Sequence, residues 1–370
     1  MTDASSDLQK YGVPFYGAGW VPYNHIRSKL ASQEKVEEDK EEEKDPTPGI
    51  PNAIVVSHVD LASNSLSDQP VVKHETGSDL PYRMAVHPHG DGILCSFQQS
   101  CRLFEWKESE GNEVHKLSIK VSEKVLTQLE DVGQQLALTF NSEGSIVAVG
   151  GEDGSLRVFK WPSMEKILNE AQAHSSVKNL DFSCDGKFLV SLGSALCRVW
   201  DVTSSRVVTS LAKGNDEIFV YCRFSPINDK NTHLYIAAVT DHGGSILTYD
   251  TATWKRIRTS RVVREAISAF NVSSDGKFLA VGTVGGDLCI INTANMKVQM
   301  MVKKAHLGLV TALTFSPDSR ALVSASLDSS ARVTLIKDQT KSGGMSWIII
   351  ILMVLLAIAV YFMKEKGIIP

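Results

Sequence analysis

The sequence predicts an all-β protein, a seven-bladed β-propeller over residues 1–340 followed by one C-terminal transmembrane helix. Three observations predict this architecture. Six segments repeat one pattern of short apolar strands and tight turns, a fainter unit precedes them, and an uncharged apolar run lies near the C-terminus. Such a series is expected to close into a ring, because closure removes exposed sheet edges.

The first unit of the series is interrupted. Residues 16–22, Tyr-Gly-Ala-Gly-Trp-Val-Pro, resemble a first strand, and residues 54–60 resemble a third strand that ends in an aspartate. Between them lies an insertion, residues 31–48, in which Glu34–Asp45 contains eight acidic residues and three lysines, a net charge of −5. We interpret the insertion as a solvated surface loop; a helix with Glu/Lys pairs and an interaction tail are the alternatives.

Six further units follow at a regular spacing. Aligned on the residue before their first turn, they lie 54, 42, 42, 48 and 43 residues apart. This spacing is typical of WD40 blades, whose period is roughly 40–45 residues. Asp185-Gly186 and Asp275-Gly276 suit the turns, because both dipeptides allow left-handed backbone conformations. The aligned residues are Val86, Phe140, Phe182, Phe224, Val272 and Phe315.

Two units carry polar side chains at positions that form a structural hydrogen-bond relay in WD40 blades. The relay ties adjacent strands together, so we expect these residues to be structural rather than catalytic. No nucleophile elbow of the GxSxG kind accompanies them. They are His174, Ser191 and Trp200 in one unit, and His306, Ser324 and Asp328 in the other.

Other catalytic and metal-binding chemistry finds no support in the sequence. Gly150-Gly151 and Gly285-Gly286 are interpreted as blade turns, because no helix follows either pair to hold a phosphate. No GxxxxGK[ST], HExxH or CxxC motif occurs, and the six cysteines are typical of a reduced cytosolic domain. No catalytic residue and no metal site are therefore predicted, and the protein is not expected to be an enzyme.

The charge balance excludes nucleic-acid binding through a general positive field. The 38 basic and 42 acidic residues give a net charge of −4. Removing the −5 of Glu34–Asp45 leaves +1 for the rest of the chain, so the body of the protein is nearly neutral.

The predicted transmembrane helix covers residues 345–363. Trp347–Met363 is a run of 17 residues without a charge, about 25 Å long as a helix, which suits a thin bilayer such as the endoplasmic reticulum. The N-terminus has no secretory signal, so residues 1–340 are expected to stay in the cytosol. Residues 364–370 would then form a short lumenal tail, and the protein would be single-pass.

Several blocks are more specific than a generic WD40 repeat: YGVPFYGAGWVP, GIPNAIVVSHVDLASNSLSDQPV, GSDLPYRMAVHP, CRVWDV, KKAHLGLVTALTFSPDSR and YFMKEKGIIP. They resemble the COPII-initiating exchange factors of the endoplasmic reticulum, the Sec-twelve family, and its plant members most closely. The resemblance covers nearly the whole chain. It implies a seven-bladed propeller facing the cytosol and, in active members, exchange of GDP for GTP on the small GTPase Sar, which then recruits the COPII coat.

The resemblance also indicates where this chain departs from the active members. Their first blade carries a glycine-rich loop that binds a potassium ion, reaches the GTPase and leads into Gly-Ile-Pro-Asn. Here Gly49, Ile50 and Asn52 remain from that motif, but residues 31–48 contain no glycine. Glycine gives a backbone cheap access to the conformations of an ion cage, so we expect the potassium site to be lost and no cofactor to be bound.

The leading hypothesis is therefore a trafficking role without strong exchange activity. One plant branch of the family, the phosphate transporter traffic facilitator, departs from the exchange factors in this way. The resemblance to it implies partners among membrane cargo such as phosphate transporters, with the Sar small GTPase as a further partner. An active exchange factor for Sar that initiates COPII vesicles is the alternative.

Overall fold

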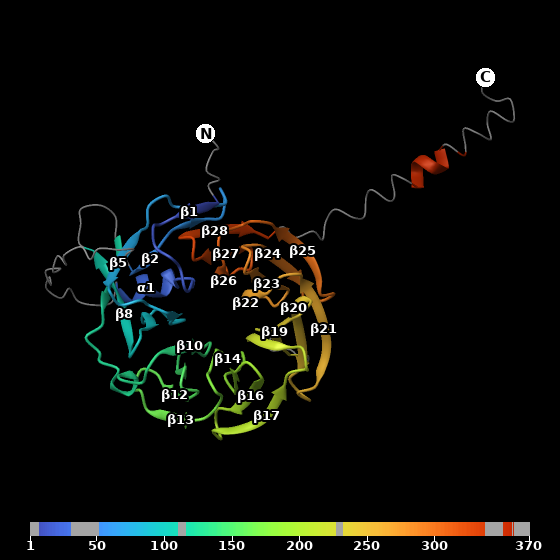
Figure 1. Ribbon diagram of the computed structural model, residues 1–370. Coiled ribbons are helices and arrows are strands. Elements are labelled where there is room, and N and C mark those ends of the chain that lie inside the picture. Colours follow the sequence, from blue (N-terminus) through green and yellow to red (C-terminus); the bar gives the residue numbers. More distant parts are fainter. Residues whose placement is uncertain are drawn as a thin grey trace, which may run out of the picture. The chain divides into compact units, whose positions relative to one another are not determined.

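The protein is seen in a computed structural model that describes residues 7–30, 52–109, 116–226, 232–336, 351–356 and 358. The chain divides into two units, Met1–Leu335 and Ile336–Pro370. The first unit is a β-propeller in which the described residues form six four-stranded antiparallel sheets around a common centre (Figure 1). The all-β propeller and the six repeats predicted from the sequence are confirmed.

Five of these sheets follow the chain from an inner to an outer strand. Two of them are β6 (Arg83–Val86), β7 (Ile93–Ser96), β8 (Cys101–Ser109) and β9 (Lys116–Val121), and β10 (Gln135–Phe140), β11 (Ile146–Gly151), β12 (Leu156–Lys160) and β13 (Lys166–Glu170). The other three are β14 (Asn179–Phe182), β15 (Phe188–Leu192), β16 (Leu196–Asp201) and β17 (Arg206–Ala212); β18 (Ile218–Phe224), β19 (His233–Thr240), β20 (Gly243–Asp250) and β21 (Arg256–Val263); and β22 (Ile267–Val272), β23 (Phe278–Thr283), β24 (Leu288–Asn292) and β25 (Lys297–Val302).

The sixth sheet joins the two ends of the propeller. β26 (Val310–Phe315), β27 (Ala321–Ser326) and β28 (Ser330–Leu335) come from its C-terminal end, and β1 (Leu8–Lys10) adds the outer strand. Leu8 pairs with Arg332 and Lys10 with Ser330, and Arg332 Nη2 lies 3.5 Å from Asp7 Oδ2. The ring is therefore closed by hydrogen bonds between residues from opposite ends of the unit.

The repeated pattern showed three strands per unit, and the structure adds a fourth on the rim. The second strands are mostly apolar because both of their faces are covered by neighbouring sheets; every residue of β23 is buried. The outer strands are exposed and mixed in polarity. In β17, Val207 and Val208 are each 44% exposed. An exposed outer strand carries little hydrophobic pattern, so the sequence did not reveal it.

The prediction of a first strand at residues 16–22 is wrong, because this segment pairs in no sheet. It nevertheless lies between the last sheet and β6. Phe15 N donates to Ser326 O at 3.2 Å, and Trp20 Nε1 donates to Thr314 O at 3.4 Å. On its other side, a Cβ at Gly17 would lie 2.8 Å from Met84 Cγ. Gly17 and Gly19, which allow this close approach, also weaken the segment as a regular strand because they contribute no side chain to packing.

Residues 54–60 do form strands. They fall in β2 (Asn52–Val56) and β3 (Val59–Asp60), which pair with β5 (Val72–Gly77) and β4 (Ser65–Leu66). Ile54 packs with Ile93 and Phe104 beside β6, and Leu66 packs with Ala321 and Val333 of the last sheet. Two two-stranded sheets thus occupy the place predicted for the first blade, and the described residues hold no seventh four-stranded sheet.

The described part of this unit also contains two short helices, α1 (Tyr23–Leu30) and the 3-10 turn η1 (Thr127–Leu129). In the second unit, Ile351–Leu356 are helical. Over the ranges that the structure describes, no helix has the length and apolar character needed to cross a membrane. Most of the predicted span, residues 345–363, lies outside these ranges, as do the insertion 31–48 and the tail 364–370.

Ring closure predicts that the first ten residues stabilise the whole propeller. Deleting residues 1–10 removes the three pairs of β1 and the Asp7–Arg332 contact. At about 1 kcal/mol for each hydrogen bond lost, we expect the free energy of unfolding to fall by about 3 kcal/mol, measured by denaturant titration of the full chain in detergent. Deleting residues 1–5 leaves β1 intact and should leave the midpoint unchanged; equal midpoints for both deletions would contradict the closure.

Candidate functional site at the first blade

The end of the insertion is fixed to the propeller by β2. Gly49 and Ile50 lie outside the described residues, and Asn52 is the first residue of β2. The Asn52 side-chain amide donates to Gly77 O at 3.0 Å, at a point where the pairing of β2 with β5 shifts register. Asn52 is therefore positioned by the sheet, and its amide is already bonded within the blade.

The start of the insertion is fixed by α1, whose last residue is Leu30. Ile26 is 1% exposed and packs against the turn that contains Gly90, where a Cβ would lie 2.7 Å from Ile26 Cγ1. Gly90 has a φ of +77°, so glycine suits this position both for its backbone and for the close approach of the helix. Near the end of α1, the Lys29 ammonium forms an ion pair with Asp91.

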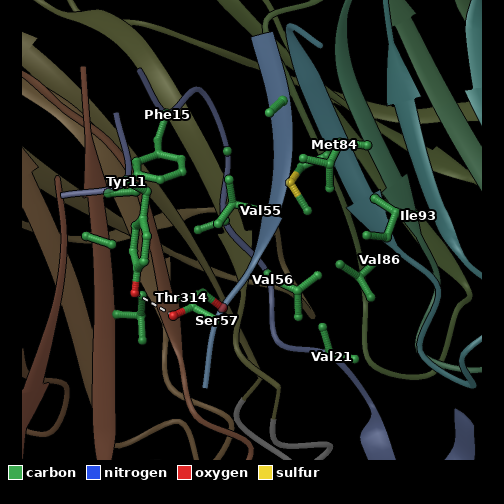
Figure 2. Close-up of a pocket in the computed structure, with 18 of the residues that line it drawn as sticks. Tyr11, Phe15, Val21, Val55, Val56, Ser57, Met84, Val86, Ile93 and Thr314 are labelled. Carbon is green, nitrogen blue, oxygen red and sulfur yellow. Dashed lines mark hydrogen bonds between the residues drawn. The ribbon is translucent and has the colours of Figure 1, made fainter. Parts of the chain in front are cut away.

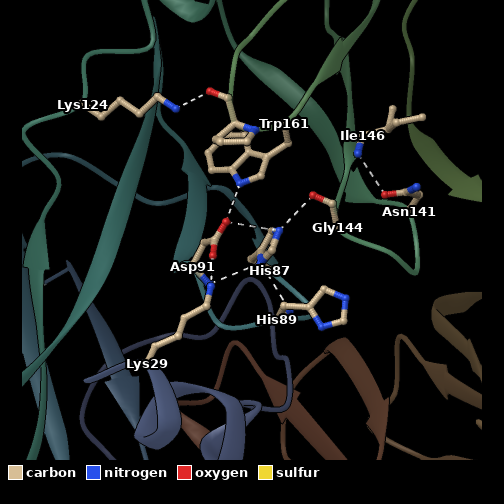
Figure 3. A network of polar contacts seen from close by, with 10 residues as sticks. Lys29, His87, His89, Asp91, Lys124, Asn141, Gly144, Ile146 and Trp161 are labelled. Carbon is tan, nitrogen blue, oxygen red and sulfur yellow. Dashed lines mark hydrogen bonds and ion pairs between the residues drawn. The ribbon is translucent and has the colours of Figure 1, made fainter. Parts of the chain in front are cut away.

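Asp91 is the centre of the polar network that holds α1 (Figure 3). Its Oδ2 accepts a hydrogen bond of 2.9 Å from Trp161 Nε1 and lies 3.5 Å from His87 Nε2. Partial burial raises the pKa of Asp91, but the hydrogen bonds from Lys29 and Trp161 outweigh this effect and hold the pKa below its usual value. Asp91 is thus a carboxylate that joins α1 to two sheets.

His87 supports the same turn as a neutral ring. Its Nδ1 lies 3.3 Å from the backbone N–H groups of His89 and Asp91 and accepts from them, so Nε2 carries the proton and donates to Gly144 O at 3.0 Å. Burial lowers the pKa of His87, which favours this neutral form.

An apolar cavity of about 580 Å³ lies between the sheet that contains β6 and β7 and the last sheet of the ring. Two segments line it along their whole lengths, residues 16–21 and residues 52–59. Figure 2 shows Tyr11 and Phe15 on one side of this space and Met84, Val86 and Ile93 on the other. We call this cavity the first-blade slot.

The six predicted relay residues lie in two separate clusters, and none of them lines the slot. Ser191 Oγ lies 2.8 Å from His174 Nε2 and accepts a 2.8 Å bond from Trp200 Nε1. In the last sheet, His306 Nε2 lies 2.7 Å from Ser324 Oγ, and its Nδ1 lies 2.6 Å from Ser330 Oγ, which donates to Asp328.

Both relay histidines are neutral at pH 7. Burial lowers the pKa of His174 and of His306 to about 4. A neutral ring bonded to serine hydroxyls can tie strands together, which is the structural role predicted for these residues. Ser330, which links His306 to Asp328, is a member that the repeat pattern did not single out.

The described residues hold no cluster arranged for a metal ion, and five of the six cysteines are buried. Across the described ranges, no group of three or more His, Cys, Asp or Glu side chains is arranged to hold a metal. The six cysteines are free, and burial raises the pKa of Cys101 and Cys197 to about 12. The potassium loop of the resemblance would precede Gly49, outside the described residues. Asn52, the described residue of its motif, donates its side-chain N–H to the sheet.

Sequence reasoning missed the residues that anchor the start of the insertion. Lys29, Asp91 and Trp161 come from three distant parts of the chain, and no local pattern joins them. The one available signal was Gly90-Asp91-Gly92, a flexible turn at the end of the first strand of a repeat.

The network predicts that Asp91→Asn loosens α1 without unfolding the propeller. The amide keeps the size of the side chain but loses the charge that attracts Lys29, at an expected cost of about 1 kcal/mol. Trypsin should then cleave after Arg27 and Lys29 several-fold faster, as measured by mass spectrometry over time. Glu165→Gln, which breaks the exposed Lys160–Glu165 pair, is the matched control. Equal cleavage rates in the two variants would contradict the anchoring role of Asp91.

Comparison with known proteins agrees with this architecture. The repeat family described as WD domain, G-beta repeat matches residues 129–160, 165–201 and 297–334. The chain is 50% identical over 363 residues to SEC12-like protein 2 of Arabidopsis thaliana, covering 94% of this chain and 92% of the relative. It is 32% identical to SEC12-like protein 1 of the same plant, over 77% of this chain and 71% of the relative.

More distant relatives carry a name that states an activity. The guanine nucleotide-exchange factor SEC12 of Rattus norvegicus is 27% identical over 384 residues, covering 86% of this chain and 89% of the relative. The mouse protein of the same name is 25% identical over the same shares. With half of its residues identical to a SEC12-like protein over nearly the full length of both, this chain belongs to the SEC12-like family of WD40-repeat proteins.

Proposed function

We propose that the protein promotes export of membrane cargo from the endoplasmic reticulum. In this proposal residues 345–363 anchor it as a single-pass protein, the tail 364–370 is lumenal, and a propeller with seven blade positions faces the cytosol. The observation that carries the proposal is the anchoring of the insertion. α1 and β2 hold its two ends on the first blade, where the resemblance places contact with the Sar GTPase.

We further propose that nucleotide exchange on Sar is weak or absent. An exchange factor must stabilise the nucleotide-free GTPase more than the bound form, which requires a contact loop held in one shape. Residues 31–48 contain no glycine and carry a net charge of −5, so they favour neither an ion cage nor a close backbone approach. Ile50 and Asn52 would then follow a charged segment in place of the glycine-rich loop of the active members.

The candidate that competes with this proposal is an active exchange factor for Sar. It is favoured by the relatives named as guanine nucleotide-exchange factors, which align with 86% of this chain. The two candidates differ in one measurable quantity, the rate of GDP release from the GTPase.

One prediction of this proposal compares the natural insertion with a glycine-rich one. The full chain in detergent should accelerate GDP release from Sar less than a glycine-loop homologue does, because its insertion offers no rigid contact. Replacing residues 32–48 with the homologue's loop should raise the rate about tenfold, measured with a fluorescent GDP analogue.

A shuffled replacement of residues 32–48, with the same composition, is the control and should leave the rate unchanged. If the natural chain already matches the homologue, the protein is an exchange factor and the proposed weak activity is wrong.

Another prediction of this proposal concerns the membrane cargo. Loss of the protein should retain a subset of plasma-membrane transporters in the endoplasmic reticulum, phosphate transporters among them, because a family member without strong exchange activity would serve selected cargo. Tagged transporters and a bulk secretory marker can be followed by microscopy in the same cells. Equal arrest of every cargo would instead favour a general exchange factor.

A further inference from the structure

The first-blade slot occupies the place of a missing strand. In each four-stranded sheet the second and the third strand pair on both edges, as the third strand β12 does with β11 and β13. In the first blade, β2 pairs with β5 on one edge, and no described strand pairs with its other edge. An unpaired strand edge presents a row of backbone N–H and C=O groups that can accept another strand.

The lining of the slot shows that this open edge faces it. Side chains of a strand alternate between its two faces, so consecutive residues can all line one space only if the strand presents its edge to that space. Residues 52–59 line the slot without interruption, and residues 16–21 also line it without interruption. The slot is therefore bounded by two extended backbones, as the space between a first and a third strand would be.

The other two walls are the faces of the neighbouring sheets, and both are apolar. One wall includes Val323, Ala325 and Ala331, and the other includes Met84, Val86, Ile93 and Cys95. A strand in the slot would thus be covered on both faces, as β23 is, where all six residues from Phe278 to Thr283 are buried. The matching occupant is a run of five or so uncharged apolar residues in extended form.

The insertion itself does not have this composition. Between α1 and β2, residues 31–51 contain only Ala31, Val36 and Ile50 as non-proline apolar residues, and no two of them are adjacent. Eight carboxylates and three ammonium groups would have to remain in water. The strand that would complete the blade has to come from elsewhere.

We propose that the first-blade slot binds an extended apolar segment of a partner polypeptide, which adds to the open edge of β2 as the second strand of the blade. A peptide suits the slot better than an acyl chain of similar volume, because only a peptide can pair the backbone groups along that edge. This inference does not depend on whether the protein exchanges nucleotide.

The test uses a peptide with the protein's own second-strand sequence, residues 277–283, Lys-Phe-Leu-Ala-Val-Gly-Thr, labelled with fluorescein. Binding to the full chain in lipid nanodiscs is followed by fluorescence anisotropy. Two control peptides carry N-methyl groups on alternate residues, one set for each strand edge; they keep the side chains but lose backbone donors. Hydrogen exchange of residues 52–57, with and without the unlabelled peptide, reports where it binds.

We expect saturable binding, about tenfold or greater loss for the peptide methylated on the edge that faces β2, and slower exchange at residues 52–57. Ala53→Phe, which fills the slot from β2, should weaken binding about tenfold. Ala252→Phe, in an exposed turn, is the matched control and should bind normally. The exchange measurement on the natural chain keeps the test valid should Ala53→Phe fail to fold.

Three results would overturn the proposal. Equal binding of all three peptides with displacement by oleate would make the slot a lipid pocket. Binding that appears only after deletion of residues 345–370 would mean that the chain's own apolar segment fills it. Absence of both binding and exchange protection at about 1 mM peptide would show that the slot accepts no strand.

Discussion

The pairing of β1 with β28 is the interaction on which the rest of the propeller depends. It joins residues 8–10 to residues 330–332, so nearly all of the first unit lies inside the loop that it closes. Without it, the last sheet would lose its outer strand and the ring would have two free ends. With it, each sheet has a neighbour on either side, and that is why the second strands can be apolar on both faces.

The sequence was most informative where this double burial acts. Strands such as β15 and β23 are almost entirely apolar, and each follows an Asp-Gly turn, so this repeat was visible in the sequence. The outer strands were not predicted because an exposed strand of mixed polarity, such as β17, resembles any surface segment in its sequence. The polar centre at Asp91 was invisible for another reason: its partners Lys29 and Trp161 are 62 and 70 residues away, and only the fold brings them together.

The first blade is where prediction from local pattern failed, and it is also where the candidate site lies. Residues 16–22 resemble a strand in sequence but pair in no sheet, and the neighbouring β6 packs against their glycines. On its two edges, β2 has only one described partner, β5. Proteins tend to depart from local consistency at functional positions. The open edge of β2, the anchored ends of the insertion and the position of the GTPase-contacting motif in the resemblance all belong to this one blade.

Because both ends of the insertion are anchored, a change in its length should have little effect on the stability of the ring. Because Ile26 and Asp91 hold one end and the β2–β5 pairing holds the other, the fold requires only that the connecting chain span a fixed gap. The entropic cost of a flexible connection rises by only about 0.6 kcal/mol for each doubling of its length. Evolution can therefore lengthen, shorten or recharge this connection at little energetic cost, and a fluorescent reporter domain spliced into it should leave the propeller folded.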